Sequence, residues 1–202
     1  MQGPGRWDKQ AWRTELLARR AAVEPAVREA ESAALAAAAA RLAAQWPRAE
    51  WIAAYVPIRG EPGSIAMLDA LRSAGSRVLL PVTGAPGPLD WAEYGDAEAL
   101  RPARFGLLEP TGARMSPAAI ESAAVILIPA LAVDRRGVRL GRGAGYYDRT
   151  LPAADPAAAL IAVVRDDELV RRLPEEPHDR RMGWALTPGG GLHRLGDRSD
   201  GN

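Results

Sequence analysis

The first 45 residues carry the pattern of two helices. Apolar side chains recur near helical spacing after Asp8, a residue type that caps helices, and they predict a helix from about Lys9 to Val23. Pro25 suits the first position of a second helix, which an alanine-rich run continues to about Gln45. We therefore expect two consecutive helices before the first strand.

After these helices, short apolar runs alternate with loops. The runs that predict strands cover 51–56, 77–82, 89–94, 124–128, 159–164 and 184–187. Short helices are predicted over 64–73, after residue 145, and over 167–173, whereas 96–115 is rich in loops. This alternation predicts a single-domain α/β fold with three layers, in which helices flank a central, mostly parallel sheet. We expect the domain to cover 1–190 and a polar tail to follow at 191–202, because the glycine-rich stretch from residue 188 predicts a frayed end.

Composition narrows the class of protein. The chain has 202 residues, of which 48% are hydrophobic and 25% charged, as in a single globular domain. The net charge of +1 gives no reason to expect a nucleic-acid partner, and no apolar run approaches the roughly 18 residues of a membrane span. The chain has no cysteine, which excludes disulfides and thiolate chemistry. We expect a cytoplasmic protein without a signal peptide.

Residues 134–149, DRRGVRLGRGAGYYDR, form the most distinctive segment of the chain. Glycines at 141, 143 and 145 alternate with other residues, and the start of a helix follows. Glycines let backbone N–H groups approach a phosphate closely, and Arg139, Arg142 and Arg149 can fork onto phosphate oxygens. The segment therefore indicates a phosphate or nucleotide site, with a glycine-rich turn and solvated arginines as the alternative.

Lys9 is the only lysine among 26 basic residues. A lysine offers a compact, flexible point charge to a phosphate, which arginine does not. Lys9 and Arg13 stand four residues apart and share one face of the predicted helix. Two cations at a helix start do not favour the helix dipole, so this face is either solvated or positioned for an anion.

Three carboxylates complete the candidate chemistry. Glu61 follows the first predicted strand, at the end where parallel sheets place ligands, although a surface turn is the alternative. Asp148 follows the glycine segment, and Asp179 stands beside His178. Carboxylate oxygens are the ligands that Mg²⁺ prefers. Sequence spacing does not show whether the two aspartates meet, and a capping or turn role is the alternative for Asp179.

Together these segments resemble the 5-formyltetrahydrofolate cyclo-ligase family, also called methenyltetrahydrofolate synthetases. The longest match is RLGRGAGYYDR at 139–149, with PALAVD at 129–134 before it. Shorter matches follow in order along nearly the whole chain: K-x-x-x-R at 9–13, Glu61, LLP at 79–81, GLLEP at 106–110 and EPHD at 176–179. Arg165 and the RMG run at 181–183 depart from the family pattern, and these departures bear on contacts to the pterin.

The resemblance implies an ATP- and Mg²⁺-dependent enzyme that cyclises 5-formyltetrahydrofolate to 5,10-methenyltetrahydrofolate and releases ADP and phosphate. The formyl oxygen would first be phosphorylated, and N10 of the folate would then close the ring. The departures suggest one alternative, a non-catalytic folate- or nucleotide-binding relative, and a sugar-phosphate or CoA-handling enzyme of similar fold is another. We expect a monomer that acts on a small molecule, without nucleic-acid or membrane partners.

The resemblance also implies roles for individual residues. Arg142, Lys9 and Tyr146 would be catalytic, and Asp148 and Asp179 would bind Mg²⁺. ATP would contact Lys9, Gln10, Ala11, Trp12, Arg13, Arg139, Leu140, Gly141, Arg142, Gly143, Ala144, Gly145, Tyr146 and Tyr147. The folate would contact Val56, Glu61, Arg142, Gly143, Ala144, Gly145 and Tyr146. The sequence does not show whether the folate carries a polyglutamate tail, although Arg59 or Arg104 could meet one.

Overall fold

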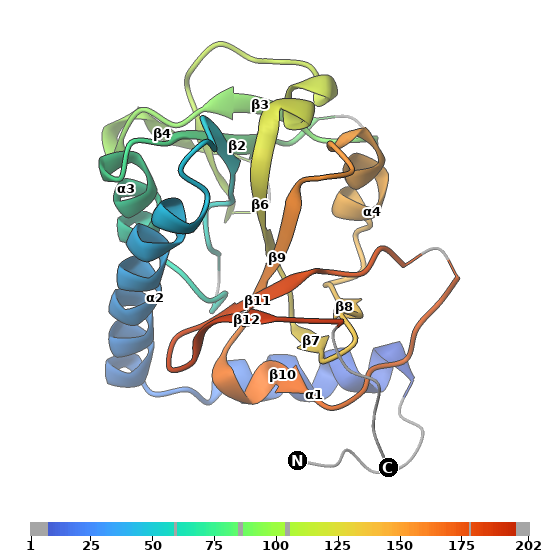
Figure 1. The fold of residues 1–202 in the computed structure, drawn as a ribbon. Helices are drawn as coiled ribbons and strands as arrows, with labels where there is room; N and C mark the ends of the chain where they lie inside the picture. The colour runs from blue at the N-terminus through green and yellow to red at the C-terminus, as the bar shows by residue number, and fades with distance from the viewer. Residues whose placement is uncertain (1–7, 59, 85–86, 104–105, 178, 197–202) are drawn as a thin grey trace.

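The computed structural model describes residues 8–58, 60–84, 87–103, 106–177 and 179–196, and Figure 1 shows how its elements are arranged. The α-helices are α1 (Lys9–Ala21), α2 (Pro25–Gln45), α3 (Ile65–Ser73) and α4 (Tyr146–Thr150). The strands are β1 (Trp51–Ala53), β2 (Arg77–Val82), β3 (Asp90–Glu93), β4 (Leu100–Pro102), β5 (Leu108–Pro110), β6 (Ala123–Pro129), β7 (Ala132–Asp134), β8 (Arg139–Leu140), β9 (Ala159–Val163), β10 (Leu169–Val170), β11 (Trp184–Thr187) and β12 (Gly191–Arg194). Short 3₁₀ turns include 97–99, 117–122, 151–153 and 166–168.

Seven strands form the central sheet, in the order β12-β11-β9-β6-β1-β2-β3. The inner pairs β11–β9, β9–β6, β6–β1 and β1–β2 are parallel, and the antiparallel strands β12 and β3 form the two edges. Two smaller sheets have the orders β10-β7-β8 and β4-β5. The predicted, mostly parallel sheet is confirmed.

Both faces of the sheet are buried, which makes the fold three-layered. Along β6, Val125 and Leu127 pack into one core and Ile126 and Ile128 into another, because successive side chains of a strand point to opposite faces. The first core is completed by α2 and α3, which lie side by side on one face of the sheet (Figure 1). The second core takes side chains from α4 and from the turns 117–122 and 151–153.

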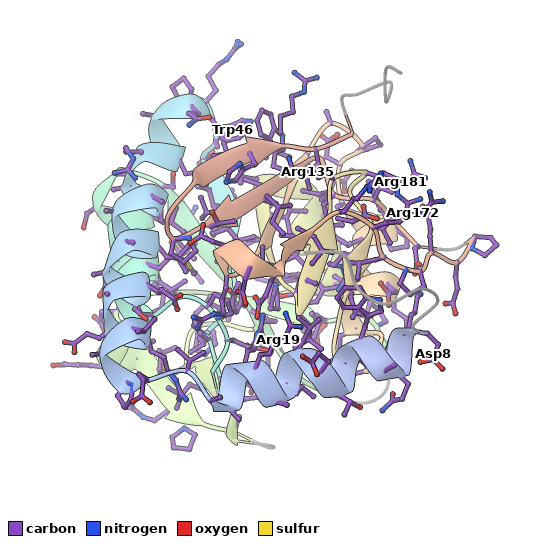
Figure 2. All side chains as sticks on the ribbon, turned by 90° about the horizontal axis from the view of Figure 1, so that it is seen from below. Asp8, Arg19, Trp46, Arg135, Arg172 and Arg181 are labelled. Carbon is purple, nitrogen blue, oxygen red and sulfur yellow. The ribbon has the colours of Figure 1, made fainter. Side chains whose placement is uncertain are left out.

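The helices form where capping and propensity signals predict them. Asp8 stands at the start of α1 (Figure 2), and its carboxylate accepts a hydrogen bond from the Ala11 N–H at 2.8 Å. α2 has the predicted bounds, and α1 ends at Ala21, two residues earlier than predicted. α3 begins after Ser64, whose side chain makes no capping hydrogen bond. Among the described residues, no helix is both long and apolar enough to cross a membrane.

Three predicted elements differ from the structure. β1 ends at Ala53, three residues earlier than predicted; the Ala54 N–H still donates to the Leu79 carbonyl at 2.9 Å, and the chain then leaves the sheet. Between residues 96 and 115, where loops were predicted, β4 and β5 form an antiparallel pair. The helix predicted over 167–173 is wrong: the 3₁₀ turn 166–168 leads into β10, whose two apolar residues pair with β7.

The first residues of the predicted polar tail form a strand of the central sheet and are not frayed. These residues, Gly191–Arg194, form β12 and pair with β11, and Gly191 closes the turn with a φ of +67°. Asp166 accepts hydrogen bonds from the N–H groups of Gly189 at 2.9 Å and Gly190 at 3.1 Å, which ties this turn to the loop after β9. The glycines that suggested a frayed end therefore make a tight hairpin. Residues 197–202 lie outside the described part of the chain.

A buried aspartate shapes the segment ahead of the glycines. Asp134, fully buried at the end of β7, accepts hydrogen bonds from the N–H groups of Arg136 at 2.9 Å, Val138 at 3.0 Å and Leu173 at 3.0 Å. These bonds fold β7 back onto β8, a hairpin that strands of two and three residues are too short to predict. The glycine-rich segment therefore starts from a fixed hairpin.

Candidate active site

A cavity of about 450 Å³ opens where β6, β1 and β2 end. α1 and the glycine loop (residues 141–145) line one side, and the loop after β1 together with the ends of β2 and β5 lines the other. In Figure 1, α1 runs along the lower edge of the molecule beneath β7 and β8, at the end of the sheet where β6 finishes. Ligands of parallel sheets bind at this carboxyl end, and the volume suits a small molecule.

The glycine loop connects β8 to α4 and packs against α1. Gly143 and Gly145 have φ angles of +97° and +69°, in the region that favours glycine. Arg13 Nε donates a hydrogen bond to the Gly141 carbonyl at 3.1 Å, and a Cβ built on Gly143 would lie 3.5 Å from Arg13 Cζ. The structure therefore brings Arg13 and the glycine loop to the same side of the cavity.

Among the described residues, three ion pairs at the cavity join predicted site residues to one another: Lys9–Asp179 at 2.9 Å, Arg139–Asp148 at 2.5 Å and Arg142–Glu61 at 3.0 Å. Every pair joins a side chain predicted to bind phosphate to a carboxylate predicted to bind Mg²⁺ or folate. Binding of a phosphate or a cation would require these partners to be exchanged, because each carboxylate already accepts from a charged donor.

Lys9 connects α1 to the loop before β11. Its Nζ donates to both oxygens of Asp179, at 2.9 and 3.1 Å, and to Glu176 at 2.9 Å. Burial lowers the pKa of Lys9, but the hydrogen bonds to the two carboxylates outweigh burial, so its pKa is raised above the ordinary value. The ammonium group therefore stays charged at the cavity in neutral solution.

Asp148 and Asp179 both line the cavity, on its cationic side. In the described ranges, no three histidine, cysteine, aspartate or glutamate side chains group as metal ligands, and His178 falls outside those ranges. Mg²⁺ is commonly held by one or two carboxylates together with substrate phosphates. The two aspartates therefore fit an ion that arrives with a nucleotide better than an ion held by the protein alone.

The opposite wall of the cavity is mostly apolar. It is lined by Val56, Ile58, Pro81, Leu89, Leu107 and Leu108. Glu61 Oε2 accepts a hydrogen bond from the Ile58 N–H at 3.1 Å, which fixes the loop after β1. The Tyr55 hydroxyl donates to the Pro62 carbonyl at 2.6 Å, and burial raises the pKa of Tyr55, so this group stays a neutral donor.

Tyr146 and Tyr147 begin α4, and both line the cavity. The Arg149 guanidinium lies 5.4 Å from the centre of the Tyr146 ring. The buried Tyr147 hydroxyl has no hydrogen-bond partner among the described residues. Burial, followed by the charge of Glu61, raises the pKa of Tyr147, so its hydroxyl stays neutral.

Most of the predicted site residues line this one cavity, but Gln10, Ala11 and Trp12 do not. Trp12 packs into a small core with Leu16, so its side chain faces the protein interior and not the cavity. Arg59, Arg104 and His178 lie outside the described residues. The roles assigned to the individual residues stay predictions.

Sequence reasoning missed several residues that line the cavity: Arg20, Tyr55, Thr83 and Glu109. Arg20 is 3% exposed, pairs with Glu168 at 2.6 Å and donates to the Ala130 carbonyl at 2.5 Å. The available signal was its helical spacing of four residues from Leu16, which places a charge on a buried face. Glu109 stood in the GLLEP match, but its role could not be read without its neighbours.

The two departures from the family pattern lie away from the cavity. Arg165 pairs with Glu31 at 2.7 Å, and Arg181 pairs with Glu175 at 2.7 Å. Met182 is buried in the second core. Since none of these residues is among those found to line the cavity, the departures connect elements of the fold and leave the described lining unchanged.

This fold and cavity define an α/β protein with a cationic, glycine-lined site beside an apolar wall. Residues 6–188 match the model of the 5-formyltetrahydrofolate cyclo-ligase family. The chain is 50% identical over 192 residues to a 5-formyltetrahydrofolate cyclo-ligase of Mycolicibacterium smegmatis, a match that covers 93% of this chain and 97% of that protein. The chain therefore belongs to the 5-formyltetrahydrofolate cyclo-ligase family and is a ligase.

A second relative agrees with this assignment, and a solved structure shares the fold. A 5-formyltetrahydrofolate cyclo-ligase of Escherichia coli (strain K12) is 30% identical over 143 residues, which cover 69% of this chain and 79% of that protein. The NMR structure of Aquifex aeolicus 5,10-methenyltetrahydrofolate synthetase superposes with a TM-score of 0.75 at 24% identity, over 96% of both chains. The Aquifex structure shares the fold of this chain.

Proposed function

We propose that the chain catalyses the ATP- and Mg²⁺-dependent cyclisation of 5-formyltetrahydrofolate to 5,10-methenyltetrahydrofolate, with release of ADP and phosphate. The observation that carries this proposal is the division of one cavity into a cationic side and an apolar side. A triphosphate suits the first side and a reduced folate the second. One shared cavity is what a phosphoryl transfer between the two requires.

The cationic side binds the triphosphate. Arg13, Arg139 and Arg142 offer guanidinium forks, Lys9 offers a point charge, and the N–H groups of the glycine loop add further donors. Asp148 and Asp179 are the residues of this chain that would hold Mg²⁺, in exchange for their present cationic partners. The ion neutralises phosphate charge when bound.

The reaction overcomes a poor leaving group. The formyl oxygen attacks the γ-phosphorus of ATP, and the bond between that phosphorus and the ADP oxygen breaks. N10 then attacks the formyl carbon, its proton is lost, and phosphate leaves with the formyl oxygen. Lys9 and Arg142 stabilise the negative charge of the transferred phosphoryl group. No covalent enzyme nucleophile is needed.

The apolar side binds the folate. Val56 contributes apolar surface, Glu61 accepts hydrogen bonds from pterin N–H groups, and the Tyr146 ring stacks on the substrate. Arg142, which now pairs with Glu61, can turn to the transferred group when both substrates are present. We place this reaction in the cytoplasm and assign it to a monomer.

The direct test is to mix the protein with 5-formyltetrahydrofolate and Mg²⁺, with and without ATP, and to follow the near-ultraviolet band of methenyltetrahydrofolate. We expect a band that grows only with ATP. Binding of both ligands without such a band would point to a non-catalytic relative, and no ATP-dependent signal would contradict the proposed function.

A further inference from the structure

We propose that Glu109 is a second carboxylate that binds the pterin and makes the site specific for its 2-amino group. The inference rests on the proposed function, because it assigns a further specificity-determining residue to the folate side of the same cavity. It starts from the place of Glu109 in the fold, its fixed geometry and the character of its neighbours.

Glu109 lies on the side of the cavity away from the glycine loop. The strands that end at the cavity stand in the order β6, β1, β2, and β5 packs against β2. The glycine loop belongs to the segment after β6, Glu61 follows β1, and Thr83 follows β2, where it contacts Glu109. Strand order therefore places Glu61 between the phosphate side and Glu109.

One oxygen of Glu109 is held and the other is open. The Thr83 N–H donates to Oε1 at 2.8 Å, and the Thr83 hydroxyl donates to the same oxygen. These two bonds fix the carboxylate group. Across the described ranges, no hydrogen bond or ion pair reaches Oε2. A half-buried carboxylate with one oxygen fixed and one oxygen open is positioned to accept a hydrogen bond from a ligand.

The neighbours of Glu109 select the kind of ligand. Pro81, Leu89, Leu107 and Leu108 line the same wall, so the surface around this carboxylate is apolar. A phosphate would be repelled by the carboxylate charge, whereas a flat heterocycle with N–H groups on its edge can pack on the apolar wall and donate to Oε2. A reduced pterin has this character.

The orientation of the bound folate determines which edge of its pterin ring lies at Glu109. In the pterin ring system, the 2-amino group is the point farthest from N5, which carries the reacting formyl group. If the formyl group faces Arg142 and the glycine loop, the 2-amino group extends past Glu61 toward β2 and β5. The 2-amino group is therefore the donor that Oε2 of Glu109 accepts.

A purely structural role would give Glu109 only the task of connecting β5 to Thr83. The two roles are separated by a ligand change that leaves the protein intact. In an analogue with a methyl group in place of the 2-amino group, the donor is missing and the shape is nearly the same. If Glu109 binds the 2-amino group, the protein binds the amino compound more tightly than the analogue. If Glu109 only connects β5 to Thr83, the two compounds bind with similar affinity.

The experiment measures Kd, without ATP, for 5-formyltetrahydrofolate and for its 2-desamino-2-methyl analogue. For the wild-type protein we expect a preference of about 10–100-fold for the amino compound, the worth of one hydrogen bond to a charged acceptor. In Glu109→Gln, the amide keeps an oxygen for Thr83 and presents an NH₂ group to the ligand, so the preference should fall to about onefold. KM for 5-formyltetrahydrofolate should rise while kcat changes much less.

Glu98→Gln is the matched control, since Glu98 is an exposed carboxylate on the 97–99 turn, and its preference should equal that of the wild type. An equal loss of affinity for both ligands in Glu109→Gln would make Glu109 a structural connection and overturn the proposal. A wild-type protein without the preference would overturn it as well, even if the variant does not fold. Failure of the proposed function is a separate result, because it appears as a wild-type protein that forms no methenyltetrahydrofolate with ATP.

Discussion

Arg142 and Glu61 contact each other across the cavity, one from the glycine loop and the other from the loop after β1. The Arg142 side chain is 36% exposed, whereas that of Glu61 is 9% exposed, so the arginine is the partner with room to move. Lys9 and Arg139 hold the two aspartates in the same manner. At the residue scale, the site is a set of ion pairs, and the proposed function requires their partners to be exchanged for phosphate and Mg²⁺.

Arg142→Ala should lower kcat by about 10²–10³-fold, because removal of one group that stabilises transition-state charge costs that much. Arg142→Lys should recover part of the loss, since it keeps the charge and loses the fork. The measurement is the rate of methenyltetrahydrofolate formation at saturating substrates. Arg135→Ala serves as control: Arg135 lies apart from α1 (Figure 2), is not among the cavity residues, and should leave the rate unchanged. Wild-type kcat in Arg142→Ala would remove the catalytic role of Arg142.

A second prediction concerns the ion pair between Arg20 and Glu168, whose side chains are each 3% exposed. Glu168→Leu should destabilise the fold by about 3–5 kcal/mol, because it leaves a buried guanidinium without its charged partner. Denaturant unfolding measures this loss. Glu93→Leu removes the carboxylate of a pair with Arg77 that is exposed on both sides, and it should hardly change the unfolding midpoint. Equal effects of the two changes would contradict the assigned burial.

At the scale of elements, the cavity depends on short, irregular segments as much as on long ones. α1 supplies Lys9 and Arg13 because four residues make about one helical turn. The β7–β8 hairpin positions the glycine loop, and the N–H of Met182 donates to the Gly137 carbonyl at 2.7 Å, which brings the loop before β11 against this hairpin. That contact helps to place Asp179 near Lys9.

Gly137→Ala tests this contact. Gly137 has a φ of +91°, and a Cβ there would collide with the Met182 carbonyl oxygen. Gly75 has a similar φ of +98° but nothing within 4 Å of a Cβ, so Gly75→Ala measures the backbone cost alone, about 1–2 kcal/mol. Gly137→Ala should cost clearly more in thermal or denaturant unfolding. A loss no larger than that of Gly75→Ala would contradict the close packing.

The β11–β12 hairpin should depend on pH through Asp166. Burial raises the pKa of Asp166, but hydrogen bonds from Thr187, Gly189 and Gly190 outweigh burial and lower its pKa below the ordinary 3.8. A lowered pKa in the folded state stabilises the fold above pH 3.8 and loses this effect as the pH falls through the folded-state value. Asp166→Asn should therefore lower the Tm at pH 7, and its difference from the wild type should shrink below pH 3.8.

The Tm of both proteins across pH 3–7 measures this dependence. Asp167→Asn, at the exposed neighbouring position, should show no comparable trend. A difference between Asp166→Asn and wild type that stays constant down to the lowest pH would contradict the ionised role of Asp166.

The elements that could be predicted are those with a local signal. The alanine-rich run of α2 and the apolar runs of β2 and β11 formed with the predicted bounds, because propensity and pattern agree along their whole length. β7, β8, β10 and β12 have two to four residues, too few to carry a pattern, and β10 pairs with β7 from a distant part of the chain. The glycines at 189–191 also lacked a sufficient local signal: their composition predicted a frayed tail, whereas they close a hairpin.

At the scale of the whole molecule, the three-layer fold brings four segments to one end of the sheet: α1, the loop after β1, the glycine loop and the loop before β11. The sequence suggested that most of these segments share a function, but only the fold shows that their side chains border one cavity. Thr83 had no local signal and Glu109 only the GLLEP match, because their roles depend on the contact between the residue after β2 and a residue of β5. The site is therefore a property of the sheet order.

In the proposed reaction, this cavity brings the γ-phosphoryl group of ATP to the formyl oxygen of the folate. The most direct measurement uses 5-formyltetrahydrofolate labelled with ¹⁸O in its formyl group and follows the label by mass spectrometry after turnover with ATP and Mg²⁺. We expect the label to appear in the released phosphate, in step with methenyltetrahydrofolate. Label found in water, with unlabelled phosphate, would contradict it.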